Sequence, residues 1–490
     1  MSTKTPNSPL PPLDPSDWDD YRSLAHQMLD DTLDHLRDLR SGPAWTKMPD
    51  DVRQELREGP VPREGAGEAA AYEDFLRLVR PYPNGNIHPR FWGWVMGTGS
   101  PQAAMSDFLA SAINPNLGGL DQAPALVERQ VVRWYGELMG LPATSGGLLV
   151  SGGTMANVLG LAVARQQSAG WDVRKDGLRG GPALRVYGST ETHGWLKKAC
   201  EFLGFGRDAF VQVPVDDDFR VDVAAMAKLI AADRAAGHRP FCVVGTSGTV
   251  QTGASDDLNA LADLAAREKL WFHVDGAFGA MARLAGSAPG AEAAVRGMER
   301  ADSLAFDLHK WGYLPIDVAM VLTREDRHLV ETFSMQAAYL AIGSRGLLSE
   351  GGIHFADRGI ELTRSFKALK VWMSLRTHGS DLIGQHIARN ITQANYLEKL
   401  VRAEKELELL APVPLNLVNF RYVRPGLAAA ALDALNKEIL VRLQEDGIAV
   451  PSGTTIRGRF AIRVAITNHR SRDDDFEALV QGVLTLGRAL

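Results

Sequence analysis

Between residues 140 and 320, short apolar stretches alternate with longer patterns of helical spacing. The apolar stretches include GLLV at 147–150, LWFHV at 270–274, SLAF at 303–306 and the FCVVG that precedes TSGT. Polar residues follow each stretch, at the point where a strand would end. Strands that alternate with helices predict a mainly parallel sheet covered by helices, and such sheets bind ligands at the carboxyl ends of their strands. We therefore expect these four strand ends to face one crevice.

The two ends of the chain show other patterns. Residues 17–39 place apolar residues at helical spacing among acids and bases, and a stretch rich in Pro and Gly follows. Beyond residue 381 the pattern reads helix, strand, helix, strand, helix, which is typical of a small α+β domain. We expect an N-terminal helical segment at residues 1–100, a large α/β domain at 101–381 and a small C-terminal domain at 382–490.

Composition narrows the classes of function. The 490 residues include 53 Lys and Arg against 59 Asp and Glu, so the net charge of -6 offers no basic field for nucleic acid or an anionic membrane. Two cysteines are too few for a disulfide framework or a cysteine-based zinc site, and no HExxH pair occurs, so we expect no metal. No apolar stretch is long enough to cross a bilayer, and the start lacks the apolar core of a secretory signal. We expect a cytoplasmic protein that acts on a small molecule.

Three strand ends carry residues with candidate chemistry. The loop 151–154 (SGGT) lies between a strand and a helix, where backbone N–H groups and the helix dipole form an anion site. Asp275 ends a second strand, and Lys310 follows a third, where a dry pocket would make the amine a nucleophile able to form a Schiff base. A phosphate cradle, an imine-forming amine and a carboxylate for a ring nitrogen are what pyridoxal 5'-phosphate requires. Read alone, the loop is also consistent with a plain tight turn and Asp275 with a helix cap.

Several motifs together resemble one known family. They are HVDGAFG around Asp275, DLHKWGY around Lys310, SGGTMAN around Thr154, and HPRF with GTGSP before the large domain. The sequence is similar to the group II pyridoxal-phosphate-dependent amino acid decarboxylases, which include the aromatic-L-amino-acid, histidine and glutamate decarboxylases. The resemblance implies an α/β protein of the type I, aspartate-aminotransferase-like fold with a mainly parallel seven-stranded sheet. It also implies a homodimer with active sites at the subunit interface.

The resemblance also implies roles for single residues. Lys310 is expected to bind the cofactor covalently, Asp275 to pair with the ring nitrogen, and His193 and Ala277 to cover the two ring faces. The remaining cofactor contacts are expected from Gly153, Thr154, Thr249, Asp307 and His309, with Thr249 replacing a family threonine that aligns with Val250. The expected substrate pocket comprises Trp92, Trp94 and Thr98.

The resemblance places one further catalytic residue in the segment FSMQAAYLAIGSRG, where Tyr339 matches the proposed proton donor of the family's catalytic loop. Family members with phenylalanine there tend to be aldehyde synthases, so Tyr339 favours decarboxylation of an L-amino acid to the amine and CO₂. The aromatic residues near position 92 favour an aromatic substrate: tyrosine, DOPA, tryptophan or phenylalanine. The alternatives are an acidic substrate such as glutamate or aspartate, an aromatic aldehyde synthase, and an inactive scaffold that retained the fold.

Overall fold

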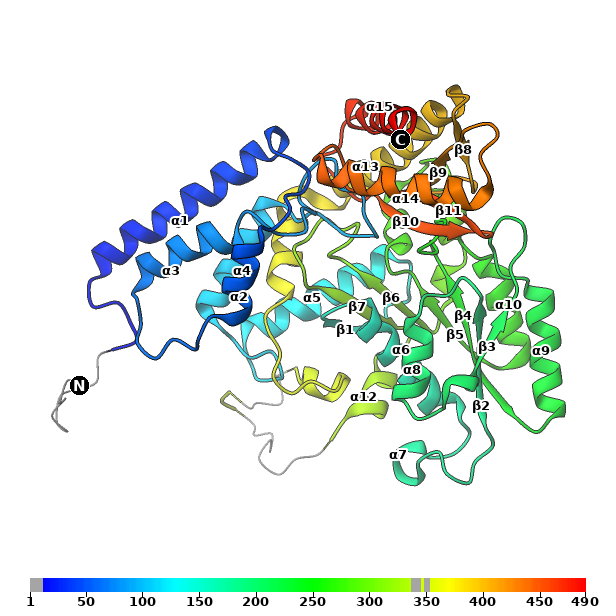
Figure 1. Ribbon diagram of the computed structural model, residues 1–490. Coiled ribbons are helices and arrows are strands. Elements are labelled where there is room, and N and C mark those ends of the chain that lie inside the picture. The colour runs from blue at the N-terminus through cyan, green and yellow to red at the C-terminus, as the bar shows by residue number, and fades with distance from the viewer. Residues whose placement is uncertain (1–11, 336–344, 348–352) are drawn as a thin grey trace.

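A seven-stranded sheet forms the centre of the molecule in a computed structural model that describes residues 12–335, 345–347 and 353–490 (Figure 1). The strand order is β1-β7-β6-β5-β4-β2-β3. Only β7 runs antiparallel to its neighbours, so the prediction of a mainly parallel seven-stranded sheet is confirmed. The strands are β1 (Gly146–Val150), β2 (Leu184–Ser189), β3 (Phe210–Val213), β4 (Arg239–Thr246), β5 (Trp271–Asp275), β6 (Ser303–Asp307) and β7 (Ala319–Thr323).

Helices bury both faces of this sheet. Every residue of β1, β5, β6 and β7 is buried, as expected for strands covered on both sides. Alternate residues of β5 join different cores: Phe272 packs in the cluster that contains Leu261, and Trp271 in the cluster that contains Leu196. The helices of this part are α4 (Pro101–Ile113), α5 (Ala123–Leu138), α6 (Gly153–Ser168), α7 (Val173–Asp176), α8 (Trp195–Phe202), α9 (Val223–Ala235), α10 (Leu258–Glu268), α11 (Ala291–Val295) and α12 (Arg327–Phe333).

The C-terminal part forms a second, smaller layer at one end of the large sheet (Figure 1). Helix α13 (Ala368–Ala403) enters it and is interrupted at Gly379, whose φ of 70° lies in the left-handed region that glycine tolerates. An antiparallel sheet in the order β10-β11-β9-β8 follows, with its own apolar core. The elements are β8 (Leu407–Leu409), β9 (Leu417–Tyr422), α14 (Ala429–Glu445), β10 (Ser452–Ile456), β11 (Arg459–Ala465) and α15 (Asp473–Ala489).

The N-terminal helices lie apart from both layers, at the blue end of the chain in Figure 1. They are α1 (Trp18–Asp38), α2 (Asp50–Glu58) and α3 (Glu68–Asp74). Asp17 caps α1 by accepting hydrogen bonds from the backbone N–H groups of Asp19 and Asp20, yet none of the residues of α1 is buried. Within residues 12–335, 345–347 and 353–490, none of the helices combines the length and apolar character needed to cross a membrane.

The segment between α3 and α4 connects the N-terminal helices to the C-terminal layer. Phe91 pairs with Val450 in a parallel bridge, and the Trp92 N–H donates to the Val450 carbonyl at 2.9 Å. The Thr467 hydroxyl donates to the Met96 carbonyl at 2.8 Å. This pairing brings residues 91–98 to the carboxyl ends of the large sheet, although up to 371 positions of chain separate its two sides.

Candidate active site

A cavity of about 620 Å³ lies at the carboxyl ends of the strands of the large sheet. The predicted strand ends meet there, because the loops after β1, β4, β5 and β6 all contribute to its wall. Of the predicted site residues, those that line it are Trp94, Gly153, Thr154, His193, Asp275, Ala277, Asp307, His309 and Lys310. Residues far apart in the sequence therefore converge on one chamber.

Lys310 lies in a tight turn directly after β6. Its Nζ is 2.7 Å from Asp307 Oδ2, and the Asp307 side chain is almost fully buried. Trp311 in this turn and Tyr313 just after it both donate hydrogen bonds to Asn390 Oδ1 of α13, at 3.1 and 2.8 Å. Hydrogen bonds to Asn390 thus hold the turn on the side of α13, while the Lys310 amine stays in the cavity wall.

Asp275 ends β5 with its carboxylate held by three donors. Its Oδ2 accepts a hydrogen bond from Trp195 Nε1 at 2.6 Å, and its Oδ1 accepts from Asn157 Nδ2 at 3.3 Å and from the Ala277 N–H at 3.1 Å. Asp275 is 3% exposed. A buried carboxylate that accepts several hydrogen bonds is held in one orientation toward the cavity.

Two histidines in the wall remain neutral bases near neutral pH. Burial lowers the pKa of His193, with Asp275 opposing that shift and Lys310 adding to it, and His193 Nδ1 accepts a hydrogen bond from the Trp195 N–H at 3.2 Å. Burial also lowers the pKa of His309, whose Nδ1 lies 2.9 Å from the Val318 carbonyl oxygen and can donate to it. Both imidazoles are therefore held by backbone contacts next to the lysine.

The N-terminus of α6 opens into the same cavity. Its N-cap residue is Gly152, and no side chain of the described residues caps the helix, which leaves its first backbone N–H groups without a capping acceptor from that part of the chain. Gly153 lets the loop approach closely, since a Cβ on it would lie 2.7 Å from Asp307 Oδ2. An uncapped helix N-terminus lined by glycine is suited to a phosphate group.

A family model described as "Pyridoxal-dependent decarboxylase conserved domain" matches residues 49–423 of the sequence. The chain belongs to this pyridoxal-dependent decarboxylase family. It is accordingly a pyridoxal-phosphate-dependent amino acid decarboxylase, as the motifs predicted.

Relatives span nearly the whole chain. An aromatic-L-amino-acid decarboxylase of Bacillus atrophaeus is 33% identical over 472 residues, which are 96% of this chain and 95% of the relative. An L-2,4-diaminobutyrate decarboxylase of Rhizobium meliloti (strain 1021) is 30% identical over 433 residues, which are 88% of this chain and 84% of the relative. The crystal structure of Oryza sativa TDC with PLP and tryptamine superposes with a TM-score of 0.88 at 27% identity, over 98% of this chain and 99% of that one. The type I fold predicted from the motifs is confirmed.

The cavity of this decarboxylase fits pyridoxal phosphate. The uncapped N-terminus of α6 suits the phosphate, the Asp275 carboxylate suits a protonated ring nitrogen, and the Lys310 amine suits the aldehyde. Two buried polar atoms at the wall, Thr246 Oγ1 and Asp307 Oδ1, have no hydrogen-bond partner among the described residues. Such orphaned atoms are costly in a dry interior and indicate a polar ligand.

Two of the expected contacts do not line the cavity. The hydroxyl of Thr249 turns inward to Thr252 Oγ1 at 3.0 Å, because a closed turn joins Thr249 to Gly253 and Ala254; Val250 lines the cavity instead. Thr98 is buried with its hydroxyl 2.7 Å from His469 Nδ1. The structure thus places neither hydroxyl in the cavity wall, and the expected roles of Thr249 and Thr98 stay predictions.

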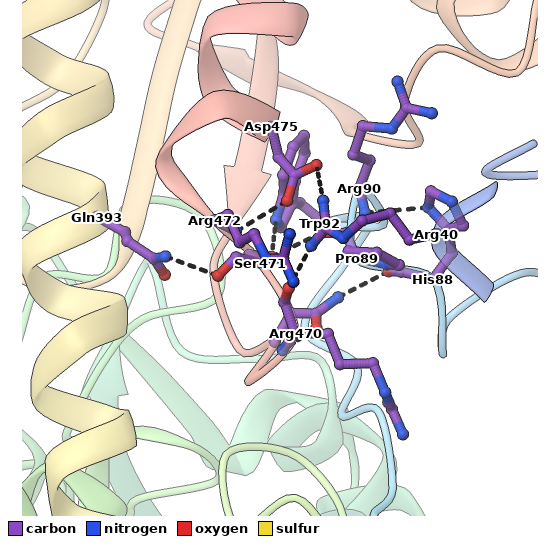
Figure 2. Close-up of polar contacts among 11 residues, drawn as sticks. Arg40, His88, Pro89, Arg90, Trp92, Gln393, Arg470, Ser471, Arg472 and Asp475 are labelled. Carbon is purple, nitrogen blue, oxygen red and sulfur yellow. Dashed lines mark hydrogen bonds and ion pairs between the residues drawn. The ribbon is translucent and has the colours of Figure 1, made fainter. Parts of the chain in front are cut away.

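Trp92 also differs from the expectation of a pocket residue. Its ring stacks on Phe476 at 4.8 Å in the core of the C-terminal layer. Figure 2 shows its indole pointing toward Ser471, to which Nε1 donates at 3.0 Å, while the Ser471 hydroxyl donates to the Pro89 carbonyl at 2.6 Å. Gln393 binds the Ser471 carbonyl from α13. Trp92 thus anchors the segment, and Trp94, two residues later, is the tryptophan that reaches the cavity.

Several residues of the wall were not predicted from the sequence, and Tyr339 lies outside the described residues. Glu191 lines the cavity with a buried Oε2 that has no partner among the described residues, and burial raises the pKa of its carboxyl. Arg463 of β11 also lines the cavity and donates to Ser452 Oγ and to the Val250 carbonyl. A cation in the apolar run FAIRVAI was the signal that could have identified Arg463.

Proposed function

We propose that this decarboxylase removes the α-carboxylate of an aromatic L-amino acid and releases the amine and CO₂. The observation that carries the proposal is that three aromatic side chains, Trp94, Trp195 and Phe278, line the same cavity as the Lys310 amine. Aromatic walls complement aromatic substrates. The name of the Bacillus atrophaeus relative, an aromatic-L-amino-acid decarboxylase, supports the same substrate class.

In this proposal each residue of the cavity contacts a different part of the cofactor. Lys310 holds the cofactor aldehyde, Asp275 the ring nitrogen, and His193 and Ala277 cover the two faces of the ring. The N-terminus of α6 at Gly153 and Thr154 holds the phosphate, with Asp307 and His309 close to that end of the cofactor. The geometry that supports this division is the convergence of a lysine, a fixed carboxylate and an open helix N-terminus on one cavity.

Pyridoxal phosphate, when bound, withdraws electrons from the α carbon of the substrate so that its carboxylate can leave as CO₂. Asp275 would hold the ring nitrogen in its protonated form, because three hydrogen bonds fix its carboxylate toward the cavity. Arg463 presents a guanidinium to the cavity from the C-terminal layer, where it can hold a carboxylate of the substrate. The α carbon must then receive a proton, and we propose Tyr339 as the donor from its place in the family motif.

A homodimer is part of the proposal. Large apolar side chains are exposed on α4 and α5, among them Phe108 at 63%, Ile113 at 61% and Leu126 at 53%. Trp94 at the cavity is also half-exposed. Exposed apolar groups of this size are typical of an association surface, and light scattering of the purified protein would measure the molecular mass.

The cytoplasmic location remains a prediction from the sequence, which cell fractionation would test.

The test is product analysis. Cofactor-loaded protein is incubated with a panel of aromatic, acidic and basic L-amino acids, and products are identified by mass spectrometry. An aromatic amine from wild type, absent with Lys310→Ala and retained with the exposed control Lys405→Ala, is the expected result. Amine from an acidic or basic amino acid alone would overturn the substrate class, and aldehyde with oxygen consumption would make the protein an aldehyde synthase. In Tyr339→Phe we expect the product to shift from amine toward aldehyde.

A further inference from the structure

Behind Asp275, a chain of four hydrogen bonds runs through the buried core away from the cavity. Asn157 Nδ2 donates to Asp275 Oδ1 at 3.3 Å, and Asn157 Oδ1 lies 2.7 Å from His273 Nε2. His273 Nδ1 lies 2.7 Å from Ser303 Oγ, to which Trp271 Nε1 donates at 2.8 Å. His273 and Ser303 are fully buried and Asn157 nearly so. Of the residues in this hydrogen-bond chain, Asp275 and Asn157 line the cavity, whereas Trp271, His273 and Ser303 lie behind its described wall.

The direction of every bond in this chain is determined by its two ends. The indole of Trp271 can only donate, so the Ser303 hydroxyl oxygen accepts from it. The Ser303 O–H can then donate a hydrogen bond to His273 Nδ1. His273 Nε2 then carries the ring hydrogen and donates to Asn157 Oδ1. At the other end, the Asn157 amide nitrogen faces two acceptors, Asp275 Oδ1 and the Gly153 carbonyl at 2.8 Å. The opposite arrangement would place the amide oxygen of Asn157 against both of these oxygens.

His273 also touches the second donor to Asp275. The Trp195 ring, whose Nε1 binds Asp275 Oδ2, meets the His273 ring edge to face with centroids 5.7 Å apart. Helix α6 leaves room for the imidazole only because residue 160 is glycine, since a Cβ there would lie 2.6 Å from His273 Cε1. Burial lowers the pKa of His273 to about 3, so the ring stays neutral and the direction of the chain does not change near neutral pH.

We propose that His273 is a positioning residue that sets the orientation and basicity of the Asp275 carboxylate through Asn157. The proposal rests on the proposed role of Asp275 as the partner of the cofactor ring nitrogen. Fewer donors on a carboxylate make it more basic, so that it competes with the ring nitrogen for the shared proton. The chain thus acts on how tightly the enzyme holds the cofactor and on the fraction of cofactor protonated at the ring nitrogen.

Two near-isosteric variants separate this role from simple packing. In His273→Gln the side-chain amide can reach the place of Nε2 and still donate to Asn157, whereas in His273→Asn it reaches only the place of Nδ1 and leaves Asn157 without its donor. We expect the asparagine variant to bind pyridoxal phosphate roughly tenfold more weakly than wild type and the glutamine variant to stay within about twofold, in line with the effect of removing outer partners of a site. His26→Gln on the exposed face of α1 is the control.

Three measurements are made on each protein. Titration of the apoenzyme with pyridoxal phosphate gives the affinity, the ¹⁵N resonance of ring-labelled cofactor gives its protonation state, and urea unfolding of the apoenzyme gives the stability of the fold. A lower protonated fraction in His273→Asn, restored in His273→Gln, supports the proposal. Equal affinities and equal ¹⁵N resonances in the two variants overturn it, whatever their stability. Should His273→Asn not fold, Ser303→Ala replaces it, with a smaller expected loss of about threefold, because Ser303 lies one bond further from Asp275.

The proposed role of Asp275 is tested separately. Asp275→Asn should change the ¹⁵N resonance of the ring nitrogen more than any change at His273. An unchanged resonance in Asp275→Asn would refute the role of Asp275 itself. An altered resonance there, together with wild-type values in every His273 and Ser303 variant, would refute only the positioning chain.

Discussion

Gly97 lies in direct contact with His309, in the turn that carries Lys310. A Cβ on Gly97 would stand 2.1 Å from the carbonyl oxygen of His309 and 2.3 Å from that of Lys310. No real side chain tolerates such distances, so the segment that bears Trp94 can reach the lysine turn only through a glycine. The backbone of the N-terminal half of the cavity wall therefore fixes the position of the residue proposed to bind the cofactor.

Gly97→Ala should displace this turn. We expect at least a tenfold loss of cofactor affinity, measured by absorbance titration, because a methyl group overlapping two carbonyl oxygens forces the backbone apart. The control is Gly65→Ala, at a position where a Cβ meets no atom within 4 Å and which should change neither affinity nor stability. Wild-type affinity in Gly97→Ala would show that the turn can move without consequence.

The two neighbouring tryptophans should respond differently to truncation. Trp92→Ala removes a ring from the core beside Phe476 and should lower the free energy of unfolding by about 3–5 kcal/mol, measured by urea titration. Trp94→Ala alters the cavity wall and should raise KM for an aromatic substrate while leaving the unfolding free energy nearly unchanged. A raised KM in Trp92→Ala together with a wild-type KM in Trp94→Ala would reverse the assignment.

Arg463→Met should impair substrate binding. The guanidinium lines the cavity and is the cation we propose for a substrate carboxylate, so its loss should lower kcat/KM by about 10- to 100-fold, the range for a hydrogen bond to a charged group. Arg463→Lys should not restore the value, because lysine cannot bind in the same forked geometry. A thermal unfolding scan of both variants separates this effect from the loss of the bond to the Val250 carbonyl.

Buried histidines should make the fold sensitive to mild acid. Burial lowers the pKa of His88 to about 4 and the pKa of His273 and His469 to about 3. Below pH 6.5 the unfolded chain binds protons at these residues while the folded chain does not, so the free energy of unfolding falls as the pH falls from 6.5 toward 4. Asp256 opposes this, since burial raises its pKa to about 6 and the folded chain keeps a proton that the unfolded chain loses.

Urea unfolding at pH 7, 6 and 5 measures the net effect of these titrations on the free energy of unfolding. Each net proton should lower the free energy of unfolding by about 1.4 kcal/mol per pH unit over this range. His469→Gln should reduce the slope by about one proton, because the glutamine cannot titrate. A midpoint that is constant or rises between pH 7 and pH 5 would contradict the prediction.

The sequence predicted those parts of the site that depend on local order. Asp275 ends one short apolar strand and Lys310 follows the next, and parallel neighbouring strands bring such ends together. Trp92 and Trp94 could not be told apart, because their segment has no regular period and Trp94 has a φ of 52°, which turns its side chain out of any simple alternation. Thr249 and Val250 differ for the same reason, since they lie in a closed turn.

Other site residues depend on pairings that a sequence does not display. Trp195 and Asn157 reach Asp275 from two different helices. Trp195 is 80 positions from Asp275 in the sequence, and Asn157 is 118 positions from it. Arg463 reaches the cavity from the C-terminal layer, through an antiparallel sheet whose contact with the large domain has no local signature. Tertiary packing decides these contacts, whereas a sequence pattern predicts only which face of a strand or helix is apolar.

The wall of the cavity contains residues from Trp94 to Arg463. The cavity is therefore complete only after most of the chain has been synthesised. On the ribosome, the helix N-terminus, Asp275 and Lys310 all emerge before β11 is made, and domains fold in the order in which they emerge. A nascent chain that stops before β11 therefore carries Lys310 without the Arg463 guanidinium, which also lines the cavity. Capture of the cofactor in its final surroundings becomes a late event, coupled to the arrival of the C-terminal layer.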